Sequence, residues 1–180
     1  LTWPTPERFS VLGLQTLGYK KQVVLPIGVV PAAAGRKVTL RGRVRYLTCN
    51  DICVPYEARL ALELPAGPAG TSAEAALIRR YQARVPSRGA RRELSVSDVY
   101  IDGSPGAETL RVKAVSRVPF EKPDLYVEGP PGYGFGKPSI IYVADRRAAV
   151  MLVALSVPPV SDERTRTGSA GKQLTVTLVD

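Results

Sequence analysis

The stretch that decides the fold is residues 38–65, "VTLRGRVRYLTCNDICVPYEARLALELP". From Val38 to Leu47 apolar and small residues alternate with polar ones, which indicates a strand with one buried face. The run from Glu57 to Pro65 alternates in the same way, with its leucines on one side. These two runs predict an antiparallel hairpin whose tip is the segment between them.

The predicted tip carries the only two cysteines of the chain, Cys49 and Cys53. Opposed residues of paired strands lie about 4.5–5.5 Å apart at Cα, and disulfides accept about 4.4–6.8 Å. A disulfide across this connection is therefore geometrically easy. Because it would close a very small loop, it would remove little chain entropy, and a weak staple at an exposed tip suits reversible exchange. Arg45 would favour a thiolate there and Asp51 would oppose it.

Other chemistries remain open for this pair. It could be a plain structural disulfide of a hairpin, or two thiolates that hold Cu(I), a soft ion that tolerates few ligands. Zinc is disfavoured because it takes four ligands and the chain has no histidine and no further cysteine. A thioredoxin-type active site is disfavoured as well, since the spacing is C-x3-C and no strand-to-helix context follows.

The composition excludes several classes of function. Without histidine the chain has no Ser/His or Cys/His catalytic pair. The net charge is +9, and residues 1–86 hold 12 Lys and Arg against 5 Asp and Glu. No block of basic residues and no aromatic stacking platform accompanies this charge, so we expect no nucleic-acid partner. The longest apolar run, near residues 148–155, is far shorter than the roughly 20 residues of a membrane span. We also expect no cofactor and no bound metal.

The rest of the chain is rich in turns, with 16 Gly and 16 Pro. Residues 1–22 are predicted to form a structured loop, and residues 23–30 a buried strand interrupted by a proline. A capping-box pattern predicts one short helix near residues 72–84, followed by a basic linker that we interpret as a domain boundary. Beyond it, six short apolar runs separated by Gly, Pro and Asp turns are typical of a β-sandwich. The fold class is therefore predicted to be all-β.

Residues 46–65, "YLTCNDICVPYEARLALELP", preceded by "WPTPERFSVLGLQTLGYKKQVVLP" at residues 3–26, resemble a known family. It is the periplasmic N-terminal region of DsbD-type thiol:disulfide interchange reductases, and the likeness is closest to the ScsB branch, which is linked by name to suppression of copper sensitivity. The resemblance implies two immunoglobulin-like β-sandwich domains joined by the short helix and linker. Residues 1–86 would be the redox-active domain and residues 87–180 the second. Family members carry strands before this point, so the first domain is expected either to lack them or to be completed by another segment.

The resemblance also implies a function and a site. The domain would relay electrons, received from the transmembrane and thioredoxin-like domains of its own full-length protein, to thioredoxin-fold proteins of the periplasm. By position, Cys53 would form mixed disulfides with partners and Cys49 would resolve them. Phe9, in a cap loop, is the candidate shield of the pair, with Glu7 as a nearby acid and Tyr46 as a further shielding candidate. The cysteine spacing of the classical family members is wider than the one in this chain.

Overall fold

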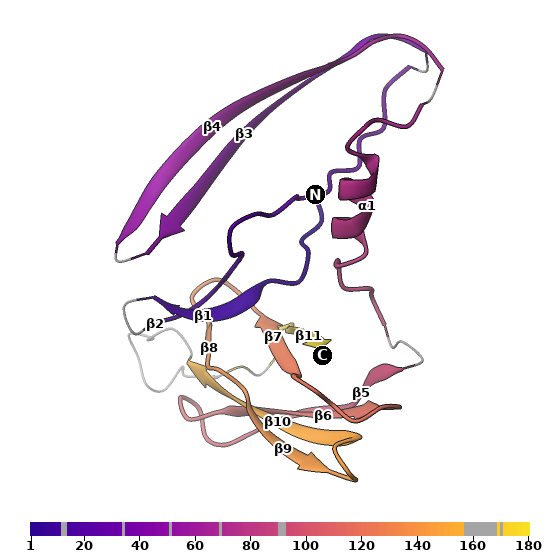
Figure 1. Ribbon diagram of the computed structural model, residues 1–180. Helices are drawn as coiled ribbons and strands as arrows, with labels where there is room; N and C mark the ends of the chain where they lie inside the picture. Colours follow the sequence, from indigo (N-terminus) through magenta and orange to yellow (C-terminus); the bar gives the residue numbers. More distant parts are fainter. Residues whose placement is uncertain are drawn as a thin grey trace. The chain divides into compact units, whose positions relative to one another are not determined.

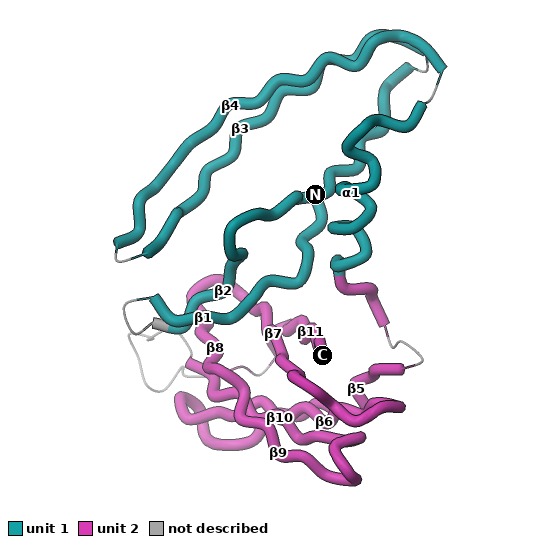
Figure 2. The backbone as a smooth tube through the Cα atoms, in the orientation of Figure 1, with its two compact units in different colours: residues 1–85 teal, residues 86–180 magenta. Residues whose placement is uncertain are grey.

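The computed structural model describes residues 1–11, 14–33, 35–50, 52–68, 70–89, 93–156, 169 and 171–180. The chain divides into two compact units, Leu1–Val85 and Pro86–Asp180 (Figure 2). Strands dominate the described residues, and the single helix among them has eight residues. The predicted all-β class is confirmed.

The second unit is a two-layered β-sandwich (Figure 1). One layer is an antiparallel sheet of order β5-β6-β10-β8, with β9 also paired to β10, and the other is the pair β11-β7. The strands are β5 (Leu94–Asp102), β6 (Thr109–Ser116), β7 (Asp124–Glu128), β8 (Gly134–Phe135), β9 (Ser139–Val143), β10 (Ala148–Ser156) and β11 (Thr175–Val179). All six apolar runs expected in this half form strands, and the two-residue β8 is an addition that the sequence did not indicate.

The core of this unit lies between the two layers. Every second residue of β10, and of β6 as far as Ala114, is buried, because successive side chains of a strand point to opposite faces. The fully enclosed side chains include Val112 on β6 and Met151 on β10, both with no exposed surface. The core cluster consists of Leu110, Val112, Ala114, Phe120, Leu125, Ala149, Met151, Val153 and Leu155.

The first unit contains two separate hairpins and the helix (Figure 1). Its elements are β1 (Glu7–Val11), β2 (Leu14–Gly18), β3 (Val38–Cys49), β4 (Cys53–Leu64) and α1 (Ala75–Gln82). Strands β3 and β4 pair without a register shift from Val38 opposite Leu64 to Cys49 opposite Cys53. The hairpin predicted from residues 38–65 is confirmed, and its strands run up to the cysteines themselves. The buried face expected for it is wrong, since no residue of β3 or β4 is buried.

Hydrogen bonds join the N-terminal segment to the later parts of this unit. The backbone N–H of Thr5 donates to the carbonyl of Arg84 at 2.9 Å, and that of Thr2 donates to Pro26 at the same distance. The buried Tyr81 of α1 donates its hydroxyl to the carbonyl of Gln22 at 3.1 Å. The Tyr81 bond thus connects residues 1–26 to α1, and the Thr5 bond connects them to the turn just beyond it.

Two predictions for this half are wrong. Residues 1–22 are not only a loop, because β1 and β2 pair antiparallel from Glu7 opposite Gly18 to Val11 opposite Leu14. Residues 23–30 form no strand. Pro26 lacks the N–H that a ladder needs, and its carbonyl accepts hydrogen bonds from the N–H and the hydroxyl of Thr2 instead.

The predicted capping box is also wrong. The helix begins at Ala75 rather than near residue 72, its N-cap is Glu74, and no side chain caps it. The N–H of Ala75 donates to the carbonyl of Ser72 at 3.2 Å, so a backbone turn occupies the place expected for the cap of Thr71. The helix ends at Gln82, close to the predicted end.

Candidate functional site

The candidate site is the tip of the β3–β4 hairpin. Cys49 is the last residue of β3 and Cys53 the first of β4, and the two form a disulfide with their Cα atoms 4.1 Å apart. The N–H of Asn50 donates to the carbonyl of Ile52 at 3.1 Å within the connection. Asp51, which the sequence analysis set against thiolate formation, lies outside the described residues.

The two cysteines differ in accessibility. Cys53 is exposed, whereas Cys49 is half-buried, and the neighbouring Ile52 is exposed too. An incoming thiolate must reach a sulfur along the line of the S–S bond, so access helps to decide which sulfur is attacked. Cys53 is the more accessible member of the pair.

The continuous register divides the hairpin into two faces, because side chains alternate along each strand. The Arg45–Glu57 and Arg43–Arg59 pairs share a face with the Cys49–Cys53 pair, because along each strand their residues lie an even number of positions from the cysteine. We call Arg41, Arg43, Arg45, Glu57 and Arg59 the arginine face. The opposite, apolar face consists of Val38, Leu40, Val44, Tyr46, Tyr56, Ala58, Leu60, Leu62 and Leu64.

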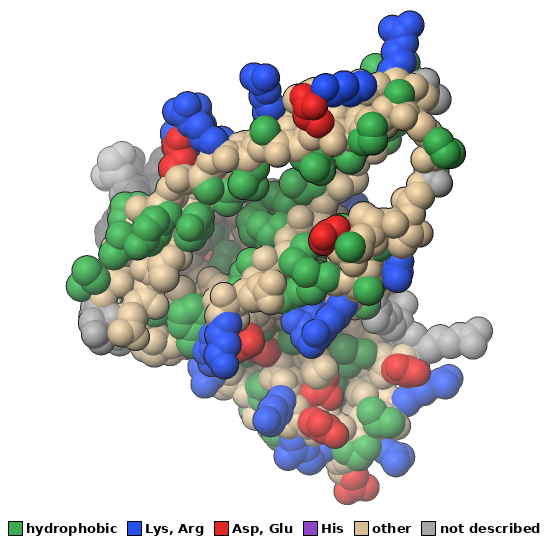
Figure 3. Space-filling model, turned by 45° about the horizontal axis from the view of Figure 1, so that its top comes forward, with side chains coloured by type: hydrophobic (Ala, Val, Ile, Leu, Met, Phe, Trp, Pro, Cys, Tyr) green, Lys and Arg blue, Asp and Glu red, His purple; other side chains and the backbone are tan. Residues whose placement is uncertain are grey.

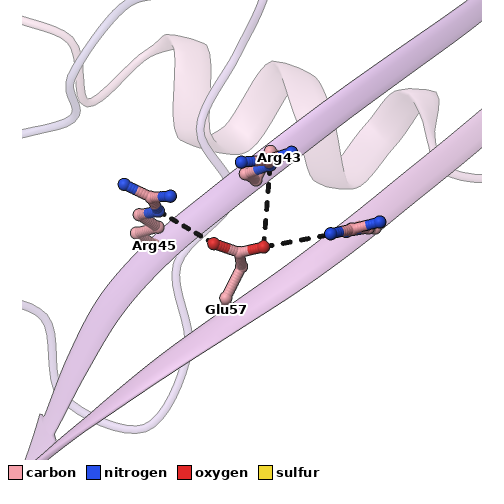
Figure 4. A network of polar contacts seen from close by, with 4 residues as sticks. Arg43, Arg45 and Glu57 are labelled. Atoms are coloured by element: carbon pink, nitrogen blue, oxygen red, sulfur yellow. Dashed lines mark hydrogen bonds and ion pairs between the residues drawn. The ribbon is translucent and has the colours of Figure 1, made fainter.

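Glu57 forms ion pairs with three arginines (Figure 4). Its Oε2 lies 2.8 Å from Nε of Arg45, and its Oε1 lies 3.6 Å from Nε of Arg43 and 3.7 Å from Nε of Arg59. Within the described residues, Arg41 has no ion pair. The arginine face therefore carries four positive charges against one negative charge.

The three predicted accessory residues lie on other surfaces of the first unit. Phe9 is a half-buried residue of β1 whose ring lies against Gly18 of β2. Glu7 forms an ion pair with Lys20 at 3.3 Å. Tyr46 belongs to the apolar face, where its ring stacks on Tyr56 with centroids 5.5 Å apart. No described hydrogen bond, ion pair or ring contact joins these three side chains to the cysteines, so their roles stay predictions.

The shared face of the disulfide and the arginines was not predicted from the sequence. The alternation predicted from Val38 to Leu47, which puts Arg41, Arg43 and Arg45 on one face, was not extended to the cysteines. The signal was available, since Arg45 and Cys49 are four residues apart on one predicted strand and Cys53 and Glu57 are four apart on the other. In the part of the chain that the structure describes, no three Cys, Asp or Glu side chains come together as metal ligands would.

The structure thus places a disulfide at the exposed tip of a hairpin, where a thiolate of another protein could reach it. Residues 1–65 match the family described as "Thiol:disulfide interchange protein DsbD, N-terminal", which supports a periplasmic interchange domain in this part of the chain. Residues 84–180, more than half of the chain, match the family described as "Domain of unknown function (DUF8393)". The chain belongs to that family. No curated protein and no solved structure matches it. No helix in the described ranges is both long and apolar enough to cross a membrane.

Proposed function

We propose that the first unit is the periplasmic electron-relay domain of a membrane thiol:disulfide reductase. It passes reducing equivalents through the Cys49–Cys53 pair to thioredoxin-fold partner proteins. The observation that carries this proposal is a disulfide at an exposed hairpin tip, within a segment that matches the DsbD N-terminal family. In this proposal residues 1–86 act as the redox domain and residues 87–180 as a second domain of the same periplasmic part.

The relay consists of two balanced exchanges. In the first, a thiolate of the upstream domain attacks the disulfide and forms a mixed disulfide, and one cysteine leaves as a thiolate; the second upstream thiol then releases the reduced pair. In the second, the Cys53 thiolate attacks a disulfide of the partner, and the partner's other sulfur leaves as a thiolate. Cys49 then attacks the Cys53 sulfur, which releases the partner as a dithiol and restores the disulfide. Two electrons pass in each exchange.

The assignment of Cys53 as the residue that bonds to partners is supported by its exposure, since Cys49 is half-buried. The adjacent ladder holds the pair in place in both redox states, because Thr48 opposes Val54 and Leu47 opposes Pro55. The sulfurs remain opposite each other when the bond opens, so no refolding separates the two half-reactions.

The accessory roles form a further part of the proposal. Phe9 shields the pair from unwanted oxidants, and Glu7 assists as an acid, when the tip is not engaged. Tyr46, the other shielding candidate, stacks on Tyr56 on the opposite face of the hairpin and is left out of this proposal. The chain is the periplasmic part of an inner-membrane protein of the ScsB branch. That branch assignment rests on the likeness of residues 3–26 and 46–65.

The first test is the reduction potential of the Cys49–Cys53 pair, measured by thiol alkylation after equilibration in glutathione or dithiothreitol buffers. Exchange proteins lie at about −180 to −270 mV, and structural disulfides below about −300 mV. We expect a value in the first range. A value in the second would reject the relay.

The second test is trapping of the intermediate. Cys49→Ser leaves Cys53 without its resolving partner, so a mixed disulfide with an oxidised thioredoxin-fold protein should accumulate. Cys53→Ser is the matched control and should trap little. Equal trapping by the two variants would contradict the assigned roles.

A further inference from the structure

The arginine face and the disulfide lie on the same side of the hairpin, and this placement bears on how a partner docks. From the tip, the cross-strand pairs on this side are Cys49–Cys53, Leu47–Pro55, Arg45–Glu57 and Arg43–Arg59. A strand rises about 3.4 Å per residue, so the Arg45 and Arg43 backbones lie about 14 and 20 Å from that of Cys49. A protein that covers the sulfurs from this side reaches the arginines within one ordinary interface.

The charge on this face is not neutralised within the unit. Glu57 provides one carboxylate for three guanidinium groups, and the side chains of Arg45 and Arg59 remain 73% and 79% exposed. Arg41, next along the strand, has no ion pair in the described part of the chain. Lys and Arg side chains gather along one side of the β3–β4 hairpin and hydrophobic ones along the other (Figure 3).

Glu57 also illustrates which ligand these arginines accept. Its carboxylate lies among three guanidinium groups and receives a hydrogen bond from Nε of Arg45 (Figure 4). Hydrogen bonds between guanidinium and carboxylate are charge-assisted and stronger than neutral ones. Carboxylates from another protein would find donors of the same kind, with more positive charge still available.

We propose that the arginine face binds an acidic surface of the partner protein whose thiol reacts with the disulfide. On the partner, an apolar patch that contacts Leu47 and Pro55 would lie between this acidic surface and the reactive sulfur. The inference rests on the proposed relay function and names the chemistry of its partner. Leu47 and Pro55 are both exposed, and they lie between the disulfide and the Arg45–Glu57 pair on this face. The apolar face is a poorer dock for exchange, because the ribbon itself would stand between a protein bound there and the sulfurs.

The charges would act mainly on the rate of encounter. Complementary fields raise association rates by about tenfold to a thousandfold and lose this effect as salt rises. The Debye length is about 30 Å at 0.01 M and 3 Å at 1 M ionic strength, so the arginines influence an approaching partner only in dilute salt. A reductant without acidic flanks should gain much less, because only its attacking thiolate is attracted.

The test uses the full chain and two synthetic peptides that share one dithiol core. One peptide carries four Asp residues beside the core and the other four Lys residues. Each peptide's rate of reduction of the Cys49–Cys53 disulfide is divided by its rate with hydroxyethyl disulfide, which corrects for the effect of the flank on its own thiols. We expect the acidic peptide to be about tenfold faster at about 0.01 M salt, and the preference to fall below about twofold at about 1 M.

Substitutions locate the effect. The triple variant Arg41→Gln, Arg43→Gln, Arg45→Gln should lose the preference, and the corresponding Lys variant should keep most of it. A control with the same loss of charge elsewhere, Lys21→Gln, Arg36→Gln, Arg80→Gln, should retain it. Equal rates for the two peptides, or an equal loss in the control, would overturn the docking proposal.

Two further arms distinguish the possible failures. Reduction of the unsubstituted protein by neutral dithiothreitol tests the relay alone; a disulfide that resists it defeats the proposed function, whereas ready reduction without a peptide preference defeats only the docking surface. The second arm is sedimentation with phosphatidylglycerol vesicles. Vesicle binding that the triple Gln variant abolishes, without any peptide preference, would assign the arginine face to lipid and overturn its assignment to a protein.

Discussion

Strands β3 and β4 of the first unit and strands β6 and β10 of the second alternate in the same way but differ in burial. In β10, and in β6 as far as Ala114, every second side chain is enclosed. In β3 and β4 no residue is buried, and Leu60 of the apolar face is 58% exposed. Alternation therefore predicts a strand and its two faces, whereas burial requires a second layer, which β7 and β11 supply in the second unit.

The structural features that hold the two units together are therefore different. The hairpin has a continuous hydrogen-bonded ladder, a disulfide and a charged face, and its side chains contribute little buried surface. The sandwich has an apolar core and no cysteine. Substitutions in the hairpin should therefore alter reactivity, and substitutions in the sandwich should alter stability.

The largest effect is expected on exchange activity. Cys53→Ser should reduce disulfide exchange to the background rate, because serine cannot form the mixed disulfide. Stability should change little, since the disulfide closes a loop of only three intervening residues. Insulin reduction with a coupled reductant measures the first quantity and urea unfolding the second. Residual activity near that of the unsubstituted chain would contradict the site.

The next effect tests burial directly. Met151→Ala in the sandwich should lower the free energy of unfolding by about 2–5 kcal/mol, because it removes a fully enclosed side chain and leaves a cavity. Leu60→Ala on the apolar face is the matched truncation and should cost less than about 1 kcal/mol, since Leu60 is exposed. Urea unfolding followed by circular dichroism measures both. A similar cost for the two would mean that a layer covers the apolar face in solution.

A smaller effect concerns Glu108, the one buried carboxylate among the residues of the sandwich that the structure describes. Glu108 accepts hydrogen bonds from the N–H of Ser169 at 3.0 and 3.1 Å and from its hydroxyl at 3.0 Å. Glu108→Ala leaves these buried donors without an acceptor, which should cost about 1–3 kcal/mol. Ser169→Ala removes only the hydroxyl and should cost less. Hydrogen exchange at the Ser169 amide is the direct measurement, and unchanged protection in the Glu108 variant would contradict the assigned contact.

The sequence predicted the hairpin, and the cysteines facing each other across its tip, because these depend on local alternation and a three-residue connection. It left the disulfide as one of several states open to the pair. It did not predict β1 and β2, since two prolines and two glycines hide their short pattern in residues 1–22. The apolar run at residues 23–30 wrongly predicted a strand, because Pro26 has no backbone N–H to donate to a neighbouring strand. The placement of the arginines on the face of the disulfide could be recognised only from the register of the whole hairpin, which combines residues on both sides of the tip.

The smallest effect concerns the link between the N-terminal segment and β2 in the first unit. Tyr19 donates its hydroxyl to the carbonyl of Pro4 at 2.7 Å, and burial raises the pKa of this phenol. Tyr19→Phe should cost about 1 kcal/mol, the usual net value of a neutral hydrogen bond. The fluorescence of Trp3, the only tryptophan and a near neighbour of Pro4, reports on this unit during unfolding.

The raised pKa of Tyr19 also gives this contact a pH dependence. The folded state holds the phenol proton more tightly than the unfolded state, so the contribution is fully present below the unfolded pKa near 10 and is lost as the pH rises through the folded value. Stability of the first unit should therefore fall more steeply above pH 10 in the unsubstituted protein than in Tyr19→Phe. Parallel pH profiles for the two would show that the Tyr19 hydroxyl is not desolvated, and the link between residues 1–6 and β2 would then be weaker than the hydrogen bond to Pro4 implies.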